Sequence, residues 1–177
     1  MSESELQYAE AEHLLAHLHG ADEKVRTGAF RGRLKHLKRL GIPLDSNPGR
    51  GAKITYTQEQ VWQWAFCLEL AEFGIDPTII VQLVKTEWEA RLLPEFRKAS
   101  AAAAGDDVYF IATPRLMESG WDSKSTRAIE ISWFHLKVSD SVLWRIVGTK
   151  RRAIILNASD LCRIIDGIFR VKPRNKG

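Results

Sequence analysis

The stretch that decides the fold is residues 24–61, KVRTGAFRGRLKHLKRLGIPLDSNPGRGAKITYTQEQV. Between residues 24 and 53 there are nine lysines and arginines and one acid, Asp45, so this segment carries +8. The whole chain of 177 residues carries only +4, and the remainder therefore sums to −4. A dense positive segment in an otherwise mildly acidic chain favours a polyanionic partner.

The segment FRGRLKHLKRLG, residues 30–41, predicts a helix that is basic around most of its circumference. Its apolar stripe consists of Phe30, Leu34, Leu37 and Leu40. Gly41 is expected to cap the C-terminus of this helix. Two helices are predicted before it, one over residues 4–19 and a short one over residues 21–27 that stops at Gly28.

Turn chemistry follows the basic helix at Asn-Pro-Gly-Arg-Gly, residues 47–51. This turn lies between Pro43-Leu44 and the β-favouring Ile54-Thr55-Tyr56, which together predict a small hairpin. Arg50 and Lys53 would lie at or near its tip.

Capping signals predict a pair of helices after the hairpin. Thr57 and Gln60 have the spacing of a capping box, and Gly74 is expected to cap the end of that helix. Asp76-Pro77 predicts the start of the next helix, and Pro94 its end or bend. Three tryptophans lie in this pair: Trp64 and Trp88 are expected in the core, and Trp62 is expected at an exposed interface.

The second half of the chain has a different pattern. Residues 99–107, ASAAAAGDD, predict a linker, and strands are predicted over 108–112, 127–138 (with a bulge near Phe134) and 151–157. Ser159 is expected to cap a last helix whose inward residues are Leu161, Ile164, Ile165 and Ile168. The predicted fold class is mainly α with an α+β C-terminal part.

The order of these elements resembles the N-terminal DNA-binding domain of the MerR-type bacterial regulators, over about residues 13–90. The resemblance is carried by Arg26-Thr27-Gly28, by Leu34, by Leu40-Gly41-Ile42-Pro43, by Tyr56-Thr57-Gln58-Glu59-Gln60-Val61 and by Phe73-Gly74-Ile75-Asp76. It implies a MerR-like winged helix-turn-helix over residues 1–98, followed after the linker by a small α+β domain over 108–177. The chain departs from the family at His36 and Leu37, where aromatic residues are usual, and past Pro94, where the family's long dimer helix is cut short.

The resemblance implies a sequence-specific regulator of transcription that binds double-stranded DNA, because a helix fits the major groove and arginine suits guanine. Arg33, Lys35 and His36 would face the bases, and Lys38 and Arg39 would meet phosphate. Arg50 and Lys53 would contact DNA from the wing. The complete expected DNA-binding set is Arg31, Arg33, Lys35, His36, Lys38, Arg39, Arg50 and Lys53.

Composition and motifs argue against several other classes. The two cysteines, Cys67 and Cys162, are far apart and are expected to be buried thiols, and the histidines lack the partners of a metal site. No nucleophile–base pair, phosphate loop or paired carboxylates has recognisable spacing, so we expect neither an enzyme nor a cofactor. No apolar run approaches the roughly 18 residues of a membrane span. The expected location is the cytoplasm, in association with the nucleoid.

Two other functions fit the same pattern. The first is an architectural accessory protein, similar to the phage excisionases, that bends DNA. The second is a protein-interaction adaptor whose winged helix does not bind DNA. In the regulator hypothesis a homodimer is expected, and the C-terminal domain would serve dimerisation, a protein partner or a small-molecule effector.

Overall fold

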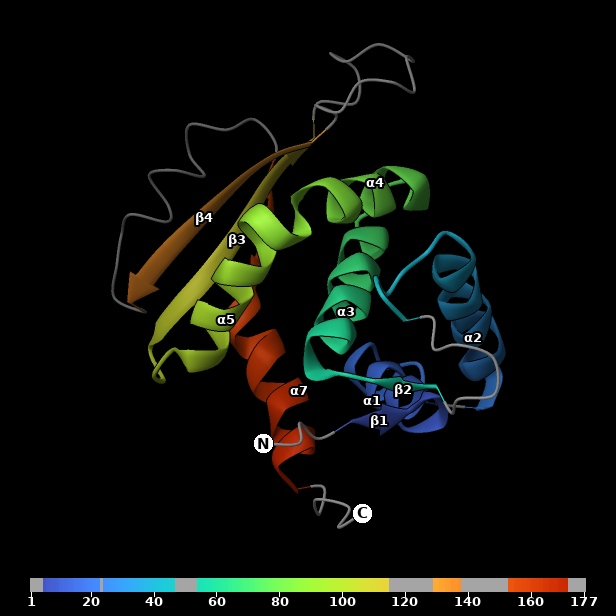
Figure 1. Ribbon diagram of the computed structural model, residues 1–177. Coiled ribbons are helices and arrows are strands. Elements are labelled where there is room, and N and C mark those ends of the chain that lie inside the picture. The colour runs from blue at the N-terminus through green and yellow to red at the C-terminus, as the bar shows by residue number, and fades with distance from the viewer. Residues whose placement is uncertain (1–4, 23, 47–53, 115–128, 138–152, 172–177) are drawn as a thin grey trace. The chain divides into compact units, whose positions relative to one another are not determined.

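The computed structural model describes residues 5–22, 24–46, 54–114, 129–137 and 153–171. These residues are mainly helical and add two small antiparallel sheets, which confirms the predicted class of mainly α with some β (Figure 1). The chain divides into two compact units. The first unit is Met1–Val81 with Arg163–Gly177, and the second is Gln82–Cys162. The boundaries expected for the domains, 1–98 and 108–177, stay predictions, and the expected linker of residues 99–107 lies within the second unit.

The first unit begins with a short strand where a helix over residues 4–19 was expected. β1 (Leu6–Gln7) pairs in antiparallel fashion with β2 (Thr55–Tyr56), and only then does α1 (Tyr8–Leu18) begin. The backbone N–H of Gln7 donates to Glu10 Oε2 at 2.7 Å, which satisfies a donor at the start of α1. Leu6 and Gln7, which were expected in the helix, thus form a strand because they pair with Thr55–Tyr56, a segment distant in sequence.

The basic segment forms one helix, α2 (Lys24–Arg39), instead of two. The predicted stop at Gly28 is wrong, because the helix continues through both Gly28 and Gly32. Each helical glycine costs about 1 kcal/mol relative to alanine. Tertiary burial offsets this cost, since the apolar stripe of α2 is packed away from water at Phe30, Leu34 and Leu37.

The C-terminus of α2 confirms the predicted glycine cap. Gly41 has φ +94°, and its N–H donates to the carbonyl of Lys38 at 3.0 Å. The N–H of Ile42 donates to the carbonyl of Leu37, also at 3.0 Å. This pair of bonds is a Schellman motif, which uses the left-handed conformation that glycine adopts without strain.

The segment after α2 differs from the predicted hairpin. The N–H of Leu44 donates to Gln63 Oε1 at 2.7 Å, and its carbonyl accepts from Gln60 Nε2 at 2.9 Å. Both backbone groups of Leu44 are therefore bound by side chains and cannot pair with Ile54–Tyr56, whose strand β2 pairs with β1 instead. Arg50 and Lys53, at the expected tip, lie outside the described residues.

Helix α3 (Gln58–Glu72) begins and ends as its caps predict. Thr57 and Gln60 form the capping box, with N–H to side-chain oxygen distances of 3.0 and 3.3 Å, and Gly74 closes the helix with φ +78°. At the next helix, α4 (Pro77–Glu87), the N–H of Thr78 donates to Asp76 Oδ1 at 2.8 Å, so the Asp76 cap is confirmed too. These devices depend only on residues a few positions apart.

An aromatic cluster forms the centre of the first unit. The ring of Tyr56 lies 4.7 Å from that of Trp64, and the ring of Tyr8 lies 6.3 and 6.1 Å from the two. Tyr56 and Trp64 are fully buried, which confirms the core role expected of Trp64. Burial, with a smaller contribution from Glu12, raises the pKa of Tyr8 to about 12, so this phenol stays neutral.

The last helix, α7 (Ala158–Val171), contributes its second half to the first unit. Asp166 is buried there, and its Oδ1 accepts from Trp62 Nε1 at 3.1 Å and from Gln58 Nε2 at 2.5 Å. Trp62 is therefore buried within the first unit, and the expectation that it lies at an exposed interface is wrong. A carboxylate in this position supplies a charged acceptor for the indole N–H of a buried tryptophan.

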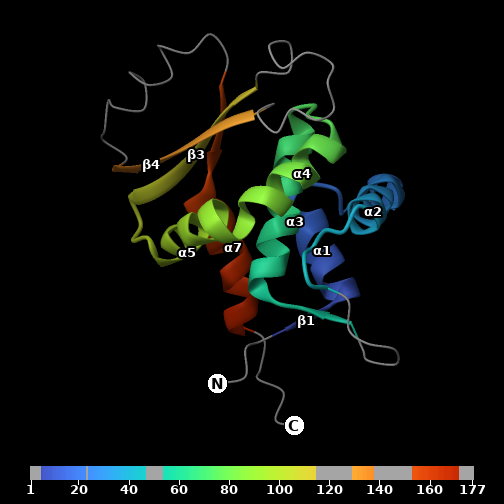
Figure 2. The ribbon, with the colours of Figure 1, turned by 45° about the horizontal axis from the view of Figure 1, so that its top comes forward.

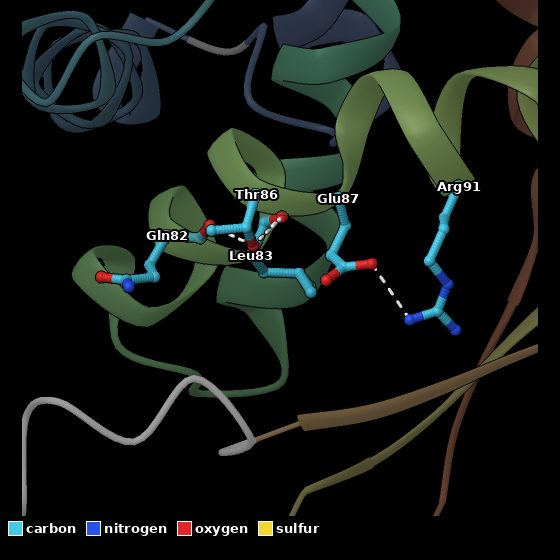
Figure 3. A network of polar contacts seen from close by, with 5 residues as sticks. All are labelled: Gln82, Leu83, Thr86, Glu87 and Arg91. Carbon is cyan, nitrogen blue, oxygen red and sulfur yellow. Dashed lines mark hydrogen bonds and ion pairs between the residues drawn. The ribbon is translucent and has the colours of Figure 1, made fainter.

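The helical part of the second unit continues past α4 without a break. A π-helical turn, η1 (Trp88–Leu92), leads into α5 (Leu93–Ala101), which has Pro94 in its first turn. Close to the junction, Thr86 Oγ1 donates to the carbonyls of Gln82 and Leu83, and Arg91 Nη1 lies 3.0 Å from Glu87 Oε2 (Figure 3). Pro94 thus marks a change of helical type. Trp88 is buried in the core as expected.

The second unit also contains a three-stranded sheet in the order β4-β3-β5, with α5 against β3 (Figure 1). Its strands are β3 (Asp106–Pro114), β4 (Ile129–Lys137) and β5 (Ile154–Asn157). β3 and β4 pair one to one from Asp106↔Lys137 to Pro114↔Ile129. The bulge expected near Phe134 is therefore wrong, because the register does not shift along the whole ladder.

Helix α7 also differs from its predicted details. Its cap is Asn157, whose Oδ1 accepts from the N–H of Asp160 at 3.0 Å, whereas Ser159 Oγ accepts from the N–H of Val108 at 2.9 Å. Of the four residues expected to face inward, Leu161 and Ile165 are buried, but Ile164 and Ile168 are exposed. The helix is turned so that it buries Cys162, Asp166 and Phe169. Cys67 and Cys162 are buried free thiols, as predicted.

Candidate nucleic-acid interface

The basic helix α2 carries five lysines and arginines and one histidine between Arg31 and Arg39, and no acid. The structure separates these cations into two groups. Three of them are anchored, each to a different element of the first unit: Arg31, Arg33 and Lys38. Lys35, His36 and Arg39 are not anchored in this way. The side of α2 on which they lie is therefore the side available to a partner.

Arg31 is tied to α1. Its Nη2 and Nε lie 2.6 and 2.8 Å from Glu12 Oε1. Glu12 is buried, with a side-chain exposure of 9%, while that of Arg31 is 51%. The pair raises the pKa of Arg31, chiefly because its guanidinium donates a hydrogen bond to Glu12. Because a buried carboxylate needs a counter-charge, we assign Arg31 to holding α2 against α1.

Arg33 is tied to α3. Its Nη1 lies 2.5 Å from Glu72 Oε1, and both side chains are more than half exposed. A pair this exposed contributes little to stability. The guanidinium has five N–H donors, so one bond to Glu72 leaves most of them available.

Lys38 is tied to the aromatic cluster. Its Nζ donates to the hydroxyl of Tyr56 at 3.1 Å and lies 5.6 and 5.8 Å from the ring centroids of Tyr8 and Tyr56. An ammonium group at this distance from two aromatic faces gains cation–π attraction. The geometry favours a structural role for Lys38 over the phosphate contact expected from its position in the sequence.

Lys38→Ala is expected to lower the free energy of unfolding by about 1–2 kcal/mol, because it removes the cation–π contacts and the bond to Tyr56. Lys35→Ala on the same helix is the matched control, since Lys35 is exposed, and should change stability by less than about 0.5 kcal/mol. Urea unfolding followed by circular dichroism measures both. Equal losses in the two variants would show that the Tyr8–Tyr56 contacts contribute nothing specific.

The outer face of α2 carries the other group of cations. Lys35 and Arg39 are exposed, lie four residues apart on one side of the helix, and make no hydrogen bond or ion pair with any described residue. Gly28 and Gly32 lie on the same side, and a Cβ added at either would have no atom within 4 Å. Figures 1 and 2 show α2 at the edge of the first unit. We call Gly28, Gly32, Lys35 and Arg39 the outer face of α2.

His36 is half-buried on the flank of this face. The pKa of Asp76 is lowered chiefly by the hydrogen bonds that Thr78 donates to it, and to a smaller extent by electrostatic attraction to His36. Arg50 and Lys53 complete the expected set, but they lie outside the described residues.

A depression of about 530 Å³ lies between α1 and α2, beside the outer face. Arg31 and Lys35 line it, but so do Glu12 and Asp22. Acidic side chains in the depression oppose a phosphate there, since like charges repel. The electropositive part of α2 is thus its exposed ridge from Lys35 to Arg39.

The described residues give no sign of other common kinds of site. None of their helices is long and apolar enough to cross a membrane. Within the same residues, no three His, Cys, Asp or Glu side chains are grouped to hold a metal ion. Comparison with protein-family models and with curated proteins finds no match to this chain.

The sequence pattern placed the cations on one helix but did not reveal the residues that hold them. Glu12 and Tyr56 lie 19 and 18 residues from their partners on α2, and Glu72 lies 39 residues from Arg33. No local spacing signals such pairs. The useful signal is the absence of acids from α2 itself, which requires any counter-charge to come from another element.

Proposed function

We propose that this protein binds double-stranded DNA through the outer face of α2, as a sequence-specific regulator of transcription. The observation that carries the proposal is that Lys35 and Arg39 are exposed on a helix without acids and have no partner among the described residues. Phosphate is the natural ligand of such a pair, because each neutralised phosphate releases counterions from the duplex.

The architecture of the first unit supports this use of α2. Along the chain the elements follow one another as β1, α1, α2, β2, α3 and α4. This order is compatible with a MerR-like winged helix-turn-helix, except that β2 pairs with β1 and not with a strand directly after α2. In such an arrangement α2 is the recognition helix, because a single helix fits the major groove. Arg50 and Lys53, between α2 and β2 in the sequence, would contact the DNA backbone beside the groove.

The glycines of the outer face add a second line of support. Gly28 and Gly32 weaken α2, and a Cβ added at either would meet no atom of the described residues within 4 Å. Close packing within the described structure therefore does not explain why these two positions lack side chains. Close approach of an external surface, such as the edge of a DNA groove, gives a physical reason for them.

Gly32→Ala is expected to raise the free energy of unfolding by about 0.5–1 kcal/mol, because alanine is the better helix former. DNA affinity should fall at the same time, on the order of tenfold, since a methyl group would hold the helix away from the groove. Chemical denaturation and fluorescence anisotropy with labelled duplexes measure the two effects.

Gly167→Ala is the matched control for this variant. Gly167 lies within α7, and a Cβ added there also has no atom within 4 Å, so the same stabilisation is expected without any loss of DNA affinity. If Gly32→Ala binds DNA as tightly as the parent protein, the backbone of α2 does not approach DNA at Gly32.

The direct test is to select bound sequences from a random duplex pool and to measure affinity over a range of salt concentrations. We expect an enriched motif and a log affinity that falls linearly with log salt. A pool that stays random, together with no binding at low ionic strength, would contradict the proposal and favour the protein-interaction adaptor. Strong bending in circular-permutation gel shifts, without an effect on a nearby promoter, would favour the excisionase-like accessory protein.

The remaining parts of the proposal concern assembly. A homodimer would double the contact area and read two half-sites. The C-terminal domain would then serve dimerisation, a protein partner or a small-molecule effector. Sedimentation with and without the selected duplex distinguishes a monomer from a dimer on DNA.

A further inference from the structure

We infer that Glu72 helps to set the sequence specificity of DNA binding by limiting the orientations of Arg33, which lies outside the outer face, on the side of α2 that contacts α3. The inference rests on the proposed function and deepens it, because it assigns a role to an acid on α3 beside the basic helix. It starts from the contact of 2.5 Å between Arg33 Nη1 and Glu72 Oε1.

The contact leaves Arg33 accessible. The side-chain exposures of Arg33 and Glu72 are 59% and 54%, so neither is enclosed by the protein. Only Nη1 of Arg33 is used, and the Nε and Nη2 donors are not bonded to Glu72 in this pair. Two neighbouring donors are what an arginine needs to contact the O6 and N7 atoms of guanine together.

Glu72 lies at a helix end that is closed by backbone hydrogen bonds and flanked by buried residues. It is the last residue of α3, where the N–H of Gly74 donates to the carbonyl of Ala71 at 2.9 Å and that of Ile75 to the carbonyl of Leu70 at 3.4 Å. Leu70 and Ile75 on either side are buried. The backbone that carries Glu72 is thus held in place, and the pairing of its carboxylate with Arg33 favours one orientation of the longer arginine side chain.

The neighbouring acid on α3 has a different contact. Glu69 Oε1 lies 3.7 Å from the Nδ1 of His19, in the turn between α1 and α2. Burial, and then the charge of Glu72, raises the pKa of Glu69, while burial lowers the pKa of His19. Glu69 and Glu72 carry the same charge on one helix, but the structure pairs only Glu72 with Arg33.

Two effects of Glu72 act in the same direction. Holding Arg33 before DNA arrives reduces the rotamer entropy that the contact with the correct base must overcome. The negative charge also opposes binding wherever Arg33 has no base to contact, because it repels the phosphate backbone. Glu72 thus lowers the affinity for random DNA more than the affinity for the selected site, and the ratio of the two affinities rises.

The test is Glu72→Gln in the full chain, with affinity measured for the selected duplex and for a random-sequence duplex at the same salt concentration. We expect affinity for random DNA to rise and the ratio of selected to random affinity to fall by roughly tenfold, the effect of weakening one base contact. Glu69→Gln is the matched control, since it removes the same charge from α3 without touching Arg33, and its ratio should stay near that of the parent. Thermal melts should show both variants folded.

A double variant, Arg33→Gln with Glu72→Gln, completes the cycle. If Glu72 acts through Arg33, the ratio of selected to random affinity should fall as far in the double variant as in Arg33→Gln alone. An unchanged ratio in Glu72→Gln, or an equal fall in Glu69→Gln, would overturn the inference while the proposed function stands. Failure of the parent protein to bind any duplex would instead overturn the proposed function, and this inference with it.

Discussion

Asp166→Ala is expected to lower the free energy of unfolding by about 2–4 kcal/mol, the largest stability effect that the structure predicts for one polar side chain. Asp166 is 3% exposed and accepts hydrogen bonds from Trp62 Nε1 and Gln58 Nε2 at 3.1 and 2.5 Å. Its removal leaves the N–H of the buried Trp62 without this acceptor and opens a void beside it. The corresponding fall in melting temperature is about 10 °C for a chain of this size.

Two further variants separate the hydrogen bonds from the helix that carries them. Asp166→Asn keeps an acceptor oxygen and should lose less than half as much stability. Ile168→Ala is the matched control on α7, because Ile168 is 46% exposed, and its loss should stay below about 1 kcal/mol. Denaturant titration of the three variants and the parent protein measures these losses. A loss in Asp166→Ala no greater than in Ile168→Ala would mean that the bonds from α3 do not stabilise the first unit.

The largest effect on binding is expected for the double variant Lys35→Ala with Arg39→Ala. Each residue removed from a phosphate contact should reduce the salt slope of log affinity by about 0.9, so the double variant should lose nearly two units. At low salt we expect affinity for all duplexes to fall by about 10- to 100-fold. Stability should change little, because both side chains are exposed and make no bond to a described residue.

The control removes two charges elsewhere. Lys85→Ala with Arg97→Ala takes the same charge from α4 and α5, where both residues are exposed, and should leave the salt slope close to that of the parent. Parallel salt dependence in the parent and in the Lys35/Arg39 variant would show that phosphate is not bound at the outer face. A general effect of net charge would instead lower affinity equally in both double variants.

The accuracy of the sequence-based predictions follows the range of the interactions involved. The capping box at Thr57 and the cap at Gly41 were predicted correctly, because each needs only residues a few positions apart. The stop at Gly28 was wrong because the cost of a glycine is local, whereas the burial of Phe30 and Leu34 that offsets it is not.

The face of the last helix shows the same limit. Ile164 and Ile168 have the spacing of an inward stripe, yet they are exposed, and the polar Asp166 is buried. Periodicity counts apolar residues and cannot include the hydrogen bond that Trp62, more than a hundred positions earlier, offers to a carboxylate. The pairing of Leu6–Gln7 with Thr55–Tyr56 was missed for the same reason.

The sequence by itself determined that one helix carries a concentration of positive charge, because composition and helical spacing are properties of consecutive residues. It also determined the ends of the helices that local caps fix. Only the tertiary structure decided which of these cations are tied to the protein and which face outward. Glu12, Tyr56 and Glu72 reach α2 because apolar burial brings distant segments together, and Lys35 and Arg39 are left on the side that this packing does not use.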